Sequence, residues 1–187
     1  MPDPSTVPDL VTARQELYRP TPADTEGLFA IFSDPLVWLH YPSLRHRHPD
    51  QTRAMLAAWL TSWQTHGLGS WVVRLPGEDG IVGCCGCNVL RGEVWNLGYR
   101  FAADHHGRGL ATEAAAAAVA RAGQVDPALP IVAYLVAHNR ASARVAEKVG
   151  LRVVHTVADP GNPDPSVRRL VYADRALTGP QRAATEE

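Results

Sequence analysis

The stretch from Leu97 to Ala122 constrains the fold most, because it changes from strand-like to helical within one short turn. An apolar run ends in the turn His106–Ala111, which contains Gly107 and Gly109, and a helical, alanine-rich run follows directly. Two glycines at such a junction allow a tight bend in which several backbone N–H groups point at one anion. The positive end of the helix dipole adds to the attraction. The segment therefore predicts a pyrophosphate site, and hence a nucleotide-type cofactor.

The same turn lacks the patterns of two other phosphate-binding loops. It contains neither Gly-x-Gly-x-x-Gly nor the Gly-Lys-Ser/Thr ending of a P-loop. Without a lysine for a terminal phosphate or a hydroxyl in the usual magnesium position, nucleoside triphosphate hydrolysis is disfavoured. Short glycine motifs also occur by chance. For this segment taken alone, a plain strand-to-helix connection remains the alternative.

A second strand-to-helix junction follows further along the chain. The apolar run 131–137 reads as a buried strand, and Asn139 is in the position of a helix N-cap. Val145 and Val149 recur at helical spacing, and Gly150 is a helix-stop residue. The pattern predicts a short helix that starts after Asn139 and ends before Gly150.

Taken together, the two junctions resemble the GNAT superfamily of N-acetyltransferases. The first family motif, Arg/Gln-x-x-Gly-x-Gly/Ala, matches His106–Ala111 with His in the first place. The second is a strand, Asn, a short helix and Gly-Phe, matched here at Asn139 and Gly150 with Leu151 in place of Phe. The residues of both motifs look most like those of the branch that contains the ribosomal-protein N-terminal acetyltransferases. The resemblance extends from about Leu17 to Tyr172.

The predicted elements give a single domain of the α/β (α+β) class over residues 10–175. Residues 1–9 and 176–187 are expected to be flexible tails. Helices are predicted to begin at caps Thr21 and Asp50, and three strands, 70–75, 81–90 and 94–101, form an antiparallel meander. We expect a mixed, mainly antiparallel central sheet with helices on both faces. The resemblance adds splayed strands at the cofactor site.

Composition and charge narrow the possible partners. The chain has 187 residues, 45% of them hydrophobic and 20% charged, which suits one ordinary globular domain. A net charge of -1 predicts no nucleic-acid partner and no attraction to acidic membranes. No apolar run reaches the ~20 residues of a membrane span, and no signal-peptide pattern is present, so we expect a cytoplasmic protein. The three cysteines, Cys84, Cys85 and Cys87, are expected to be small buried thiols.

The resemblance implies that the cofactor is acetyl-CoA and that an amine attacks its thioester directly. It also implies that the strand ending at Phe101 bonds the pantetheine arm through its backbone, while the strand through Val136 splays away. Asn139 is expected to hydrogen-bond the arm, or to be only a helix cap, or both. The predicted cofactor-binding residues are Phe101, His106, Gly107, Arg108, Gly109, Leu110, Ala111, Asn139 and Ser142.

Two residues are predicted to be catalytic, in place of the family's usual ones. Many members carry a tyrosine seven residues after the motif asparagine, but that position here is Ala146. Ser142 is then the remaining proton donor for the leaving thiolate, unless it is only a small helical residue. Several members carry a glutamate in the fourth strand, and its counterpart here is Asn96, which could position a water or the substrate amine. No general base is evident, and Glu113 is expected to complement the helix dipole.

The acceptor is expected to be a primary amine, on a peptide N-terminus or a small molecule. Without a base, α-amino groups of pKa ~8 fit better than lysine side chains near 10.4. The aromatic and basic segment Trp38–Pro49 is predicted to be the specificity loop, with Trp38 as a substrate wall. No third ligand accompanies His46 and His48, so no metal is predicted. The protein is expected to be a monomer or a homodimer. A catalytically degenerate CoA-binding module remains the alternative function.

Overall fold

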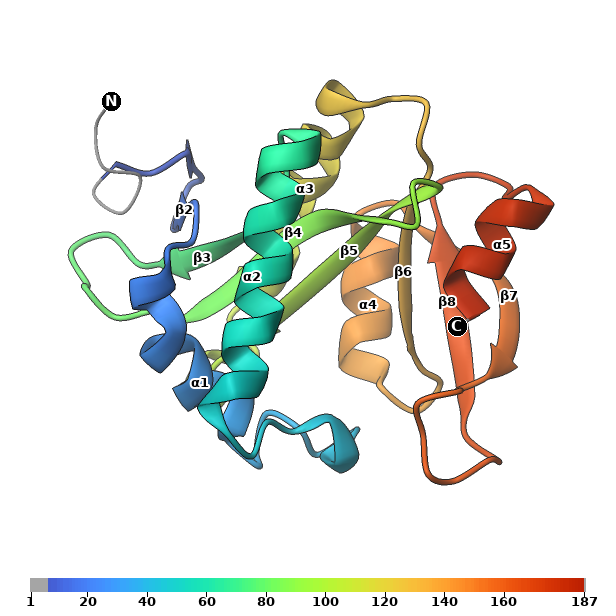
Figure 1. Cartoon of the computed structure of the whole chain (residues 1–187), viewed down its shortest axis with the longest axis horizontal. Coiled ribbons are helices and arrows are strands. Elements are labelled where there is room, and N and C mark those ends of the chain that lie inside the picture. Colours follow the sequence, from blue (N-terminus) through green and yellow to red (C-terminus); the bar gives the residue numbers. More distant parts are fainter. Residues whose placement is uncertain (1–6, 187) are drawn as a thin grey trace.

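The computed structural model describes residues 7–186, which form one eight-stranded sheet in the order β1-β2-β3-β4-β5-β6-β8-β7 (Figure 1). Neighbouring strands are antiparallel except for the parallel pair β5–β6. The predicted mixed, mainly antiparallel sheet is thus confirmed. The strands are β1 (Leu10–Val11), β2 (Glu16–Tyr18), β3 (Ser70–Arg74), β4 (Gly83–Leu90), β5 (Val94–Phe101), β6 (Ile131–Val136), β7 (Arg152–Ala158) and β8 (Arg168–Ala173).

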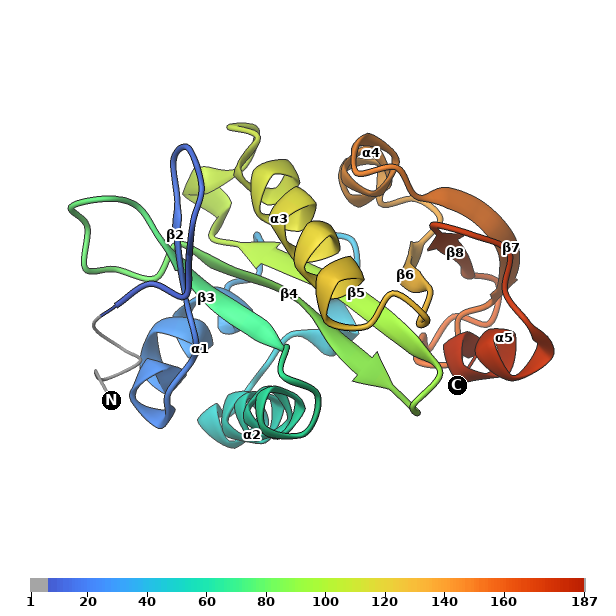
Figure 2. The same cartoon turned by 90° about the horizontal axis from the view of Figure 1, so that it is seen from above.

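Helices cover both faces of this sheet. Figure 2 shows α3 and α4 on one face and α1 and α2 on the other. No helix of residues 7–186 is long and apolar enough to cross a membrane. The α-helices are α1 (Thr25–Ser33), α2 (Pro49–His66), α3 (Leu110–Val125), α4 (Arg140–Lys148) and α5 (Gly179–Glu186).

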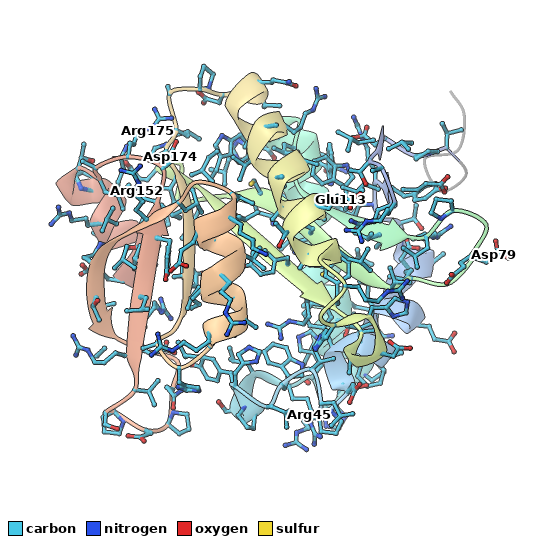
Figure 3. The ribbon with its side chains drawn as sticks, turned by 180° about the vertical axis from the view of Figure 1, so that it is seen from behind. Arg45, Asp79, Glu113, Arg152, Asp174 and Arg175 are labelled. Carbon is cyan, nitrogen blue, oxygen red and sulfur yellow. The ribbon has the colours of Figure 1, made fainter. Side chains whose placement is uncertain are left out.

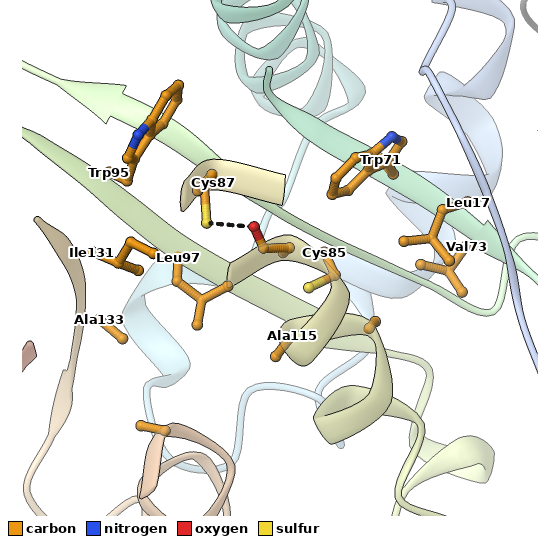
Figure 4. Packing of buried hydrophobic residues seen from close by; sticks show 14 of the residues in the cluster. Leu17, Trp71, Val73, Cys85, Cys87, Trp95, Leu97, Ala115, Ile131 and Ala133 are labelled. Atoms are coloured by element: carbon orange, nitrogen blue, oxygen red, sulfur yellow. Dashed lines mark hydrogen bonds between the residues drawn. The ribbon is translucent and has the colours of Figure 1, made fainter. Parts of the chain in front are cut away.

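The core is divided between the two faces by the alternation of side chains along the strands. Cys85 and Cys87 pack with Leu97 and Ala115 on the α3 face, as Figure 4 shows. Cys84 takes the opposite face and joins the cluster beneath α1 and α2. All three thiols are buried and free, as the sequence predicted. The small alanines of α3 allow the helix to approach the sheet closely.

The parallel pair β5–β6 separates after two residues. The strands are paired only at Trp95↔Ile131 and Asn96↔Val132. Beyond this point β5 remains paired with β4, while β6 pairs with β8, and the two strands diverge in Figure 1. The splayed strands expected at the cofactor site are therefore present.

Two helix starts differ from the sequence prediction. The backbone N–H of Thr21 does donate to the Asp24 carboxylate, but residues 22–24 form a 3-10 turn and α1 begins at Thr25. Helix α2 is capped at His48 and not at Asp50, because the side-chain oxygen of Gln51 accepts the His48 N–H. In both cases, a polar side chain three residues into the helix satisfies a free backbone donor.

The prediction of a flexible tail over residues 176–187 is wrong for its described part. Residues 179–186 form α5, in which Ala184 and Thr185 are buried. The Thr185 carbonyl accepts a hydrogen bond from Arg169 on β8 at 3.1 Å. At the other end, residues 1–6 of the predicted N-terminal tail lie outside the described residues. Asp9 is anchored by Arg19 and by the Trp71 indole.

Candidate functional site

The turn before α3 leaves several backbone donors free. Gly107 and Gly109 have φ values of +75° and +80°, the left-handed region that favours glycine. Gly109 is the N-cap of α3, and the first bond of the helix runs from Glu113 N–H to its carbonyl. The N–H groups of Leu110 and Ala111 consequently have no partner inside the helix. This end of α3 has the geometry of an anion site.

The space around both glycines is open. A Cβ at Gly107 would meet no atom within 4 Å, and one at Gly109 would meet only the Arg14 side chain, at 3.5 Å. Close packing against the protein is therefore not the reason for glycine here. The left-handed backbone conformation is the reason for glycine at both positions. The absence of side chains also leaves room for a bulky anion to approach.

A cavity of about 450 Å³ lies against this turn, and we call it the cofactor cleft. Basic side chains contribute to its wall: Arg144 and Lys148 on α4, and His105 and His106 before α3. None of the described residues that line the cleft is acidic. The cleft therefore favours a polyanionic ligand, as a pyrophosphate-containing cofactor requires. The residues of the cleft used below are His40, Tyr99, Arg100, Phe101, Gly107, Gly109, Leu110, Ala111, Asn139 and Ser142.

The hairpin turn between β1 and β2 braces the start of α3. Arg14 donates from Nη1 to the Arg108 carbonyl at 2.9 Å. The fully buried Gln15 donates from Nε2 to the Leu110 carbonyl at 3.1 Å. These hydrogen bonds occupy two backbone carbonyls of the turn, so its N–H groups remain available to a ligand.

Glu113 completes the brace from the helix side (Figure 3). Its carboxylate accepts hydrogen bonds from Thr12 Oγ1 and Arg14 Nε, each at 2.7 Å. Burial acts to raise the pKa of Glu113, but these hydrogen bonds and the charge of Arg14 outweigh it, so the pKa lies below its ordinary value. The carboxylate is an anchor for the hairpin as well as a negative charge in the first helical turn.

The structure brings nearly all of the predicted cofactor residues to this cleft. Phe101, His106, Gly107, Gly109, Leu110, Ala111, Asn139 and Ser142 all line it. Arg108 does not: its side chain is exposed outside the cleft, and only its carbonyl takes part, as the acceptor of Arg14. His106 Nε2 lies 2.9 Å from the Phe101 carbonyl, which can only accept, so this ring nitrogen carries the proton.

The start of α4 holds Ser142 in place. Asn139 Oδ1 accepts the Ser142 N–H at 3.1 Å, which confirms the predicted N-cap. The Ser142 carbonyl accepts a hydrogen bond from the Tyr99 hydroxyl at 2.8 Å. The Tyr99 hydroxyl is also the polar neighbour of the Ser142 side chain. Ala146, at the place of the family's tyrosine, is completely buried in the core.

A second cavity, of about 460 Å³, opens on the α1–α2 side of the sheet, and we call it the acceptor pocket. It shares His40, Tyr99, Arg100, Asn139 and Ser142 with the cofactor cleft, and we call these five the junction residues. The two cavities thus meet where β5 and β6 splay apart. The pocket's other lining residues include Phe32, Trp38, Tyr41, Leu44, Met55, Trp59, Cys84, Asn88, Asn96, Tyr134, Asp159 and Arg169.

Arg100 is the positive centre of the junction. Its guanidinium carbon lies 3.6 Å from the centre of the buried Trp38 ring. Burial lowers the pKa of Arg100 to about 10, so the group is still protonated near neutral pH. Burial, together with the Arg100 charge, also lowers the pKa of His40 to about 4. His40 is therefore neutral at pH 7.

The far wall of the acceptor pocket contains a buried ion pair. Arg169 donates from Nε and Nη2 to Asp159 Oδ1, at 3.2 and 2.8 Å. Its guanidinium lies over the Tyr134 ring, 4.6 Å from the centre. Tyr41 lies beside this pair with a buried hydroxyl that has no hydrogen-bond partner in the described structure. Burial, with the nearby Asp159 carboxylate, raises the pKa of Tyr41 to about 12.

Asn96 lies in the acceptor pocket, at the last paired position before the strands separate. Its Nδ2 donates to the Tyr134 hydroxyl at 3.3 Å, which leaves its Oδ1 available as an acceptor. Asn88, on β4, donates to Ser70, and its own Oδ1 is buried without a partner among residues 7–186. The pocket therefore offers unused hydrogen-bond acceptors to a donor such as an amine.

Sequence reasoning missed Arg100, Tyr99, Tyr134 and the pair Asp159–Arg169. Tyr99 and Arg100 lie in a correctly predicted strand, and only the splay of β6 turns that strand into a cavity wall. Trp38 was correctly placed beside the pocket. In the same segment, His46 bonds Thr52 at 2.8 Å and stacks on Phe32. No group of three metal-ligating side chains forms within residues 7–186.

Comparison with the sequences of known proteins identifies an acetyltransferase domain. The sequence model described as the acetyltransferase (GNAT) domain matches residues 14–152. The Bacillus subtilis protein YkkB is 29% identical over 167 residues, which are 87% of this chain and 96% of that protein.

Solved structures share the fold over nearly the whole chain. A Bordetella pertussis protein described as a GNAT-family acetyltransferase superposes with a TM-score of 0.75 at 25% identity, covering 89% of this chain and 98% of that one. RimL, a ribosomal L7/L12 α-N-protein acetyltransferase solved with coenzyme A, superposes with a TM-score of 0.73 at 16% identity, covering 90% and 97%. At 16% identity the second likeness concerns the fold alone.

Proposed function

Since the chain belongs to the GNAT family of acetyltransferases, which use acetyl-CoA, we propose that it acetylates an α-amino group by direct attack of the amine on the thioester. The observation that supports this most is the meeting of the cofactor cleft and the acceptor pocket at the junction residues. A thioester in one cavity and an amine in the other come into contact only there. Bound acetyl-CoA supplies the activated acyl group, and the residues below bind, orient and move protons.

Backbone groups make most of the proposed contacts with the cofactor. The free N–H groups of Leu110 and Ala111 hold the pyrophosphate, and Arg144 and Lys148 add positive charge. Beyond Asn96, the β5 edge that faces the gap has no strand partner, so its backbone donors and acceptors are available to the amides of the pantetheine arm. The residues that line the cleft fit this elongated, polyanionic ligand.

Ser142 is the proposed proton donor to the departing sulfur. It lies at the junction, and two hydrogen bonds fix its backbone: its N–H to Asn139 and its carbonyl to Tyr99. Ala146 offers no hydroxyl at the place where many relatives have one. Ser142 gives its proton to the sulfur directly or through a water, and the proton that the acetylated nitrogen loses returns to the serine oxygen by way of water.

Asn96 is proposed to orient the incoming amine through its free Oδ1. The described residues that line the pocket include no strong free base, because Asp159 is paired with Arg169 and His40 is a weak base with a pKa near 4. The amine must then arrive neutral. An α-amino group of pKa ~8 is neutral in roughly a tenth of molecules at pH 7, and a lysine amine near 10.4 in fewer than about a thousandth. That difference favours α-amino acceptors.

The test is a competition within one molecule. Peptides that carry both a free N-terminus and a lysine are incubated with the protein and acetyl-CoA, and the modified position is located by mass spectrometry. We expect acetylation mainly at the α-amino group, and the matched peptide with a blocked N-terminus should react far more slowly. Predominant lysine acetylation at neutral pH would overturn the proposal and imply an unidentified base.

A further inference from the structure

Arg100 is a partly buried cation with no acidic partner among residues 7–186. Among residues 7–186, its side chain makes one hydrogen bond, a long one of 3.4 Å from Nη1 to the Val37 carbonyl. Its other contacts are the aromatic faces of Trp38 and Phe32. An arginine has five N–H groups in a rigid fork suited to a carboxylate, and Arg100 lines both cavities. It therefore presents unused donors to whatever occupies the junction.

Two other arginines with little exposed surface, Arg74 and Arg169, are both neutralised. Arg74 pairs with Asp24 at 3.2 Å, and Arg169 pairs with Asp159 at 2.8 Å. Withdrawing a charge from water is costly unless a partner is provided. In these two pairs a carboxylate offsets the cost of desolvating the guanidinium. Arg100 has no such carboxylate among residues 7–186. The missing partner is a negative group that the ligand itself brings.

The charge of the acceptor pocket indicates how much negative charge is missing. Asp159 cancels Arg169, and His40 is neutral. Burial raises the pKa of the Cys84 thiol to about 12, so this group is uncharged as well. One positive charge, that of Arg100, remains among the lining residues. A singly charged carboxylate balances it.

The direction of the Arg100 side chain assigns this anion to the acceptor and not to the cofactor phosphates. Arg100 stacks on Trp38, in the cluster beneath α1 and α2. Its strand neighbours Tyr99 and Phe101 belong to the cluster on the opposite face, where the turn before α3 lies. Because Arg100 is also a junction residue, its anionic partner and the reacting amine must lie close together in the acceptor.

We infer that the acceptor is a free α-amino acid, bound through its carboxylate by Arg100, with its side chain among the aromatic residues of the acceptor pocket. This inference rests on the proposed function and narrows its α-amino acceptor. Pairing the carboxylate with Arg100 also removes the neighbouring negative charge that favours the protonated amine. The same contact then binds the substrate and makes its amine easier to deprotonate.

The experiment compares amino acids with their amides, which differ only in the negative charge. Values of kcat/KM are measured for the common amino acids and the matching amides, with wild-type protein, Arg100→Gln and Arg100→Lys. Since acids and amides differ in amine pKa, the measured quantity is the change in the acid-to-amide ratio between proteins. We expect Arg100→Gln to lower this ratio about 10- to 100-fold, and Arg100→Lys to keep part of it. Arg53→Gln, an exposed arginine that pairs with Asp50 on α2, should leave the ratio unchanged.

Acetyl-CoA affinity and thermal unfolding, measured on each variant, separate a lost contact from a lost fold. A ratio that stays within about threefold in folded Arg100→Gln overturns the inference, as does a peptide or an aminophosphonate whose reaction depends on Arg100 more than that of the amino acid. If no amine causes release of CoA, the proposed function is wrong, and the inference about Arg100 needs a separate test. Calorimetric binding of the same acids and amides to the protein–CoA complex then decides the inference. Carboxylate-dependent binding lost in Arg100→Gln supports it, and its absence overturns it.

Discussion

The cofactor cleft and the acceptor pocket have almost equal volumes, about 450 and 460 Å³, but they offer different chemical groups to a ligand. The groups of the cleft that are proposed to hold the cofactor are largely backbone: left-handed glycines, the first turn of α3 and the unpaired edge of β5. The acceptor pocket consists of side chains, including Arg100, Trp38 and the pair Asp159–Arg169. Backbone donors recognise a phosphate whatever the rest of the chain contains, whereas side chains can differ from protein to protein. We therefore expect the cofactor cleft to determine the type of reaction and the acceptor pocket to determine which amine reacts.

The two regions also differ in how the chain assembles them. Most of the cofactor cleft comes from residues 99–112 and α4, and four residues of the segment after α1 complete it: Leu36, Val37, Leu39 and His40. The acceptor pocket draws on α1, α2, the segment between them, the sheet and residues 159–169. They share only the junction residues. Substitutions on one side should therefore leave the other nearly unchanged, and those at the junction should affect the reaction itself.

The largest effect is expected at the junction. Ser142→Ala should lower kcat by about 10²–10⁴-fold, the usual contribution of a general acid, while the dissociation constant of acetyl-CoA changes only a few-fold. Rapid-quench kinetics and equilibrium titration measure the two quantities separately. Ser166→Ala, at an exposed serine that lines neither cavity, is the control and should keep wild-type turnover. Unchanged turnover in Ser142→Ala would reduce Ser142 to a structural residue.

On the acceptor side, Asp159→Asn should destabilise the fold by about 3–5 kcal/mol, because it leaves Arg169 buried and uncompensated. Denaturant unfolding measures the loss. Asp164→Asn in the same loop, at an exposed carboxylate, is the control and should cost far less. Protein that remains folded should keep its acetyl-CoA affinity. A loss below about 1 kcal/mol, or a parallel loss of cofactor affinity, would contradict the separation of the two sides.

On the cofactor side, Gly109→Val should weaken acetyl-CoA binding by about 10- to 100-fold, the range expected when charge-assisted hydrogen bonds to the phosphate are lost. Gly92→Val is a close control, because Gly92 also has a left-handed φ, of +75°, but lies in the β4–β5 hairpin. Both variants carry similar backbone strain, and only the first should lose affinity in a calorimetric titration. Equal affinities of the two would mean that the turn does not bind phosphate.

The smallest expected effect is a pH dependence of stability that arises at the junction. The pKa of His40 is about 4 in the fold, below its ordinary 6.5. Above pH 6.5 both the folded and the unfolded states are neutral at this residue. As the pH falls from 6.5 toward 4, only the unfolded state takes up the proton, so the fold loses stability.

Free energies of unfolding at pH 7 and pH 5 should show this loss, and His40→Gln should reduce it. Part of the loss should remain, because burial also lowers the pKa of His46 and His155. An identical pH dependence in His40→Gln would contradict the account of His40 as a neutral, half-buried junction residue.

The cofactor side was largely predictable from the sequence because its signals are local. A left-handed glycine before a helix and an asparagine cap at Asn139 are read from neighbouring residues, and the strands and α3 follow from their periodicity. Arg108 was the exception, since the turn directs its side chain away from the cleft. Whether these residues bind acetyl-CoA stays a prediction.

The acceptor side was not predictable in the same way. The pairing of Asp159 with Arg169 depends on the return of β8 beside β7, and the role of Arg100 depends on where β6 leaves β5. Helix α5 was missed because its eight residues have no apolar stripe. Thr185 is buried against residues distant in the sequence, among them Arg169 and His155. These contacts join segments that no local pattern connects.

The central claim is that the two cavities form one acetyltransferase site that transfers the acetyl group to an α-amino group. The most direct measurement is amine-dependent release of CoA thiol from acetyl-CoA, with the acetylated product quantified by mass spectrometry. The account predicts that an α-amino compound stimulates release and that each thiol released is matched by one Nα-acetylated product. Thiol release at the same rate with and without every amine, or no release at all, would contradict it.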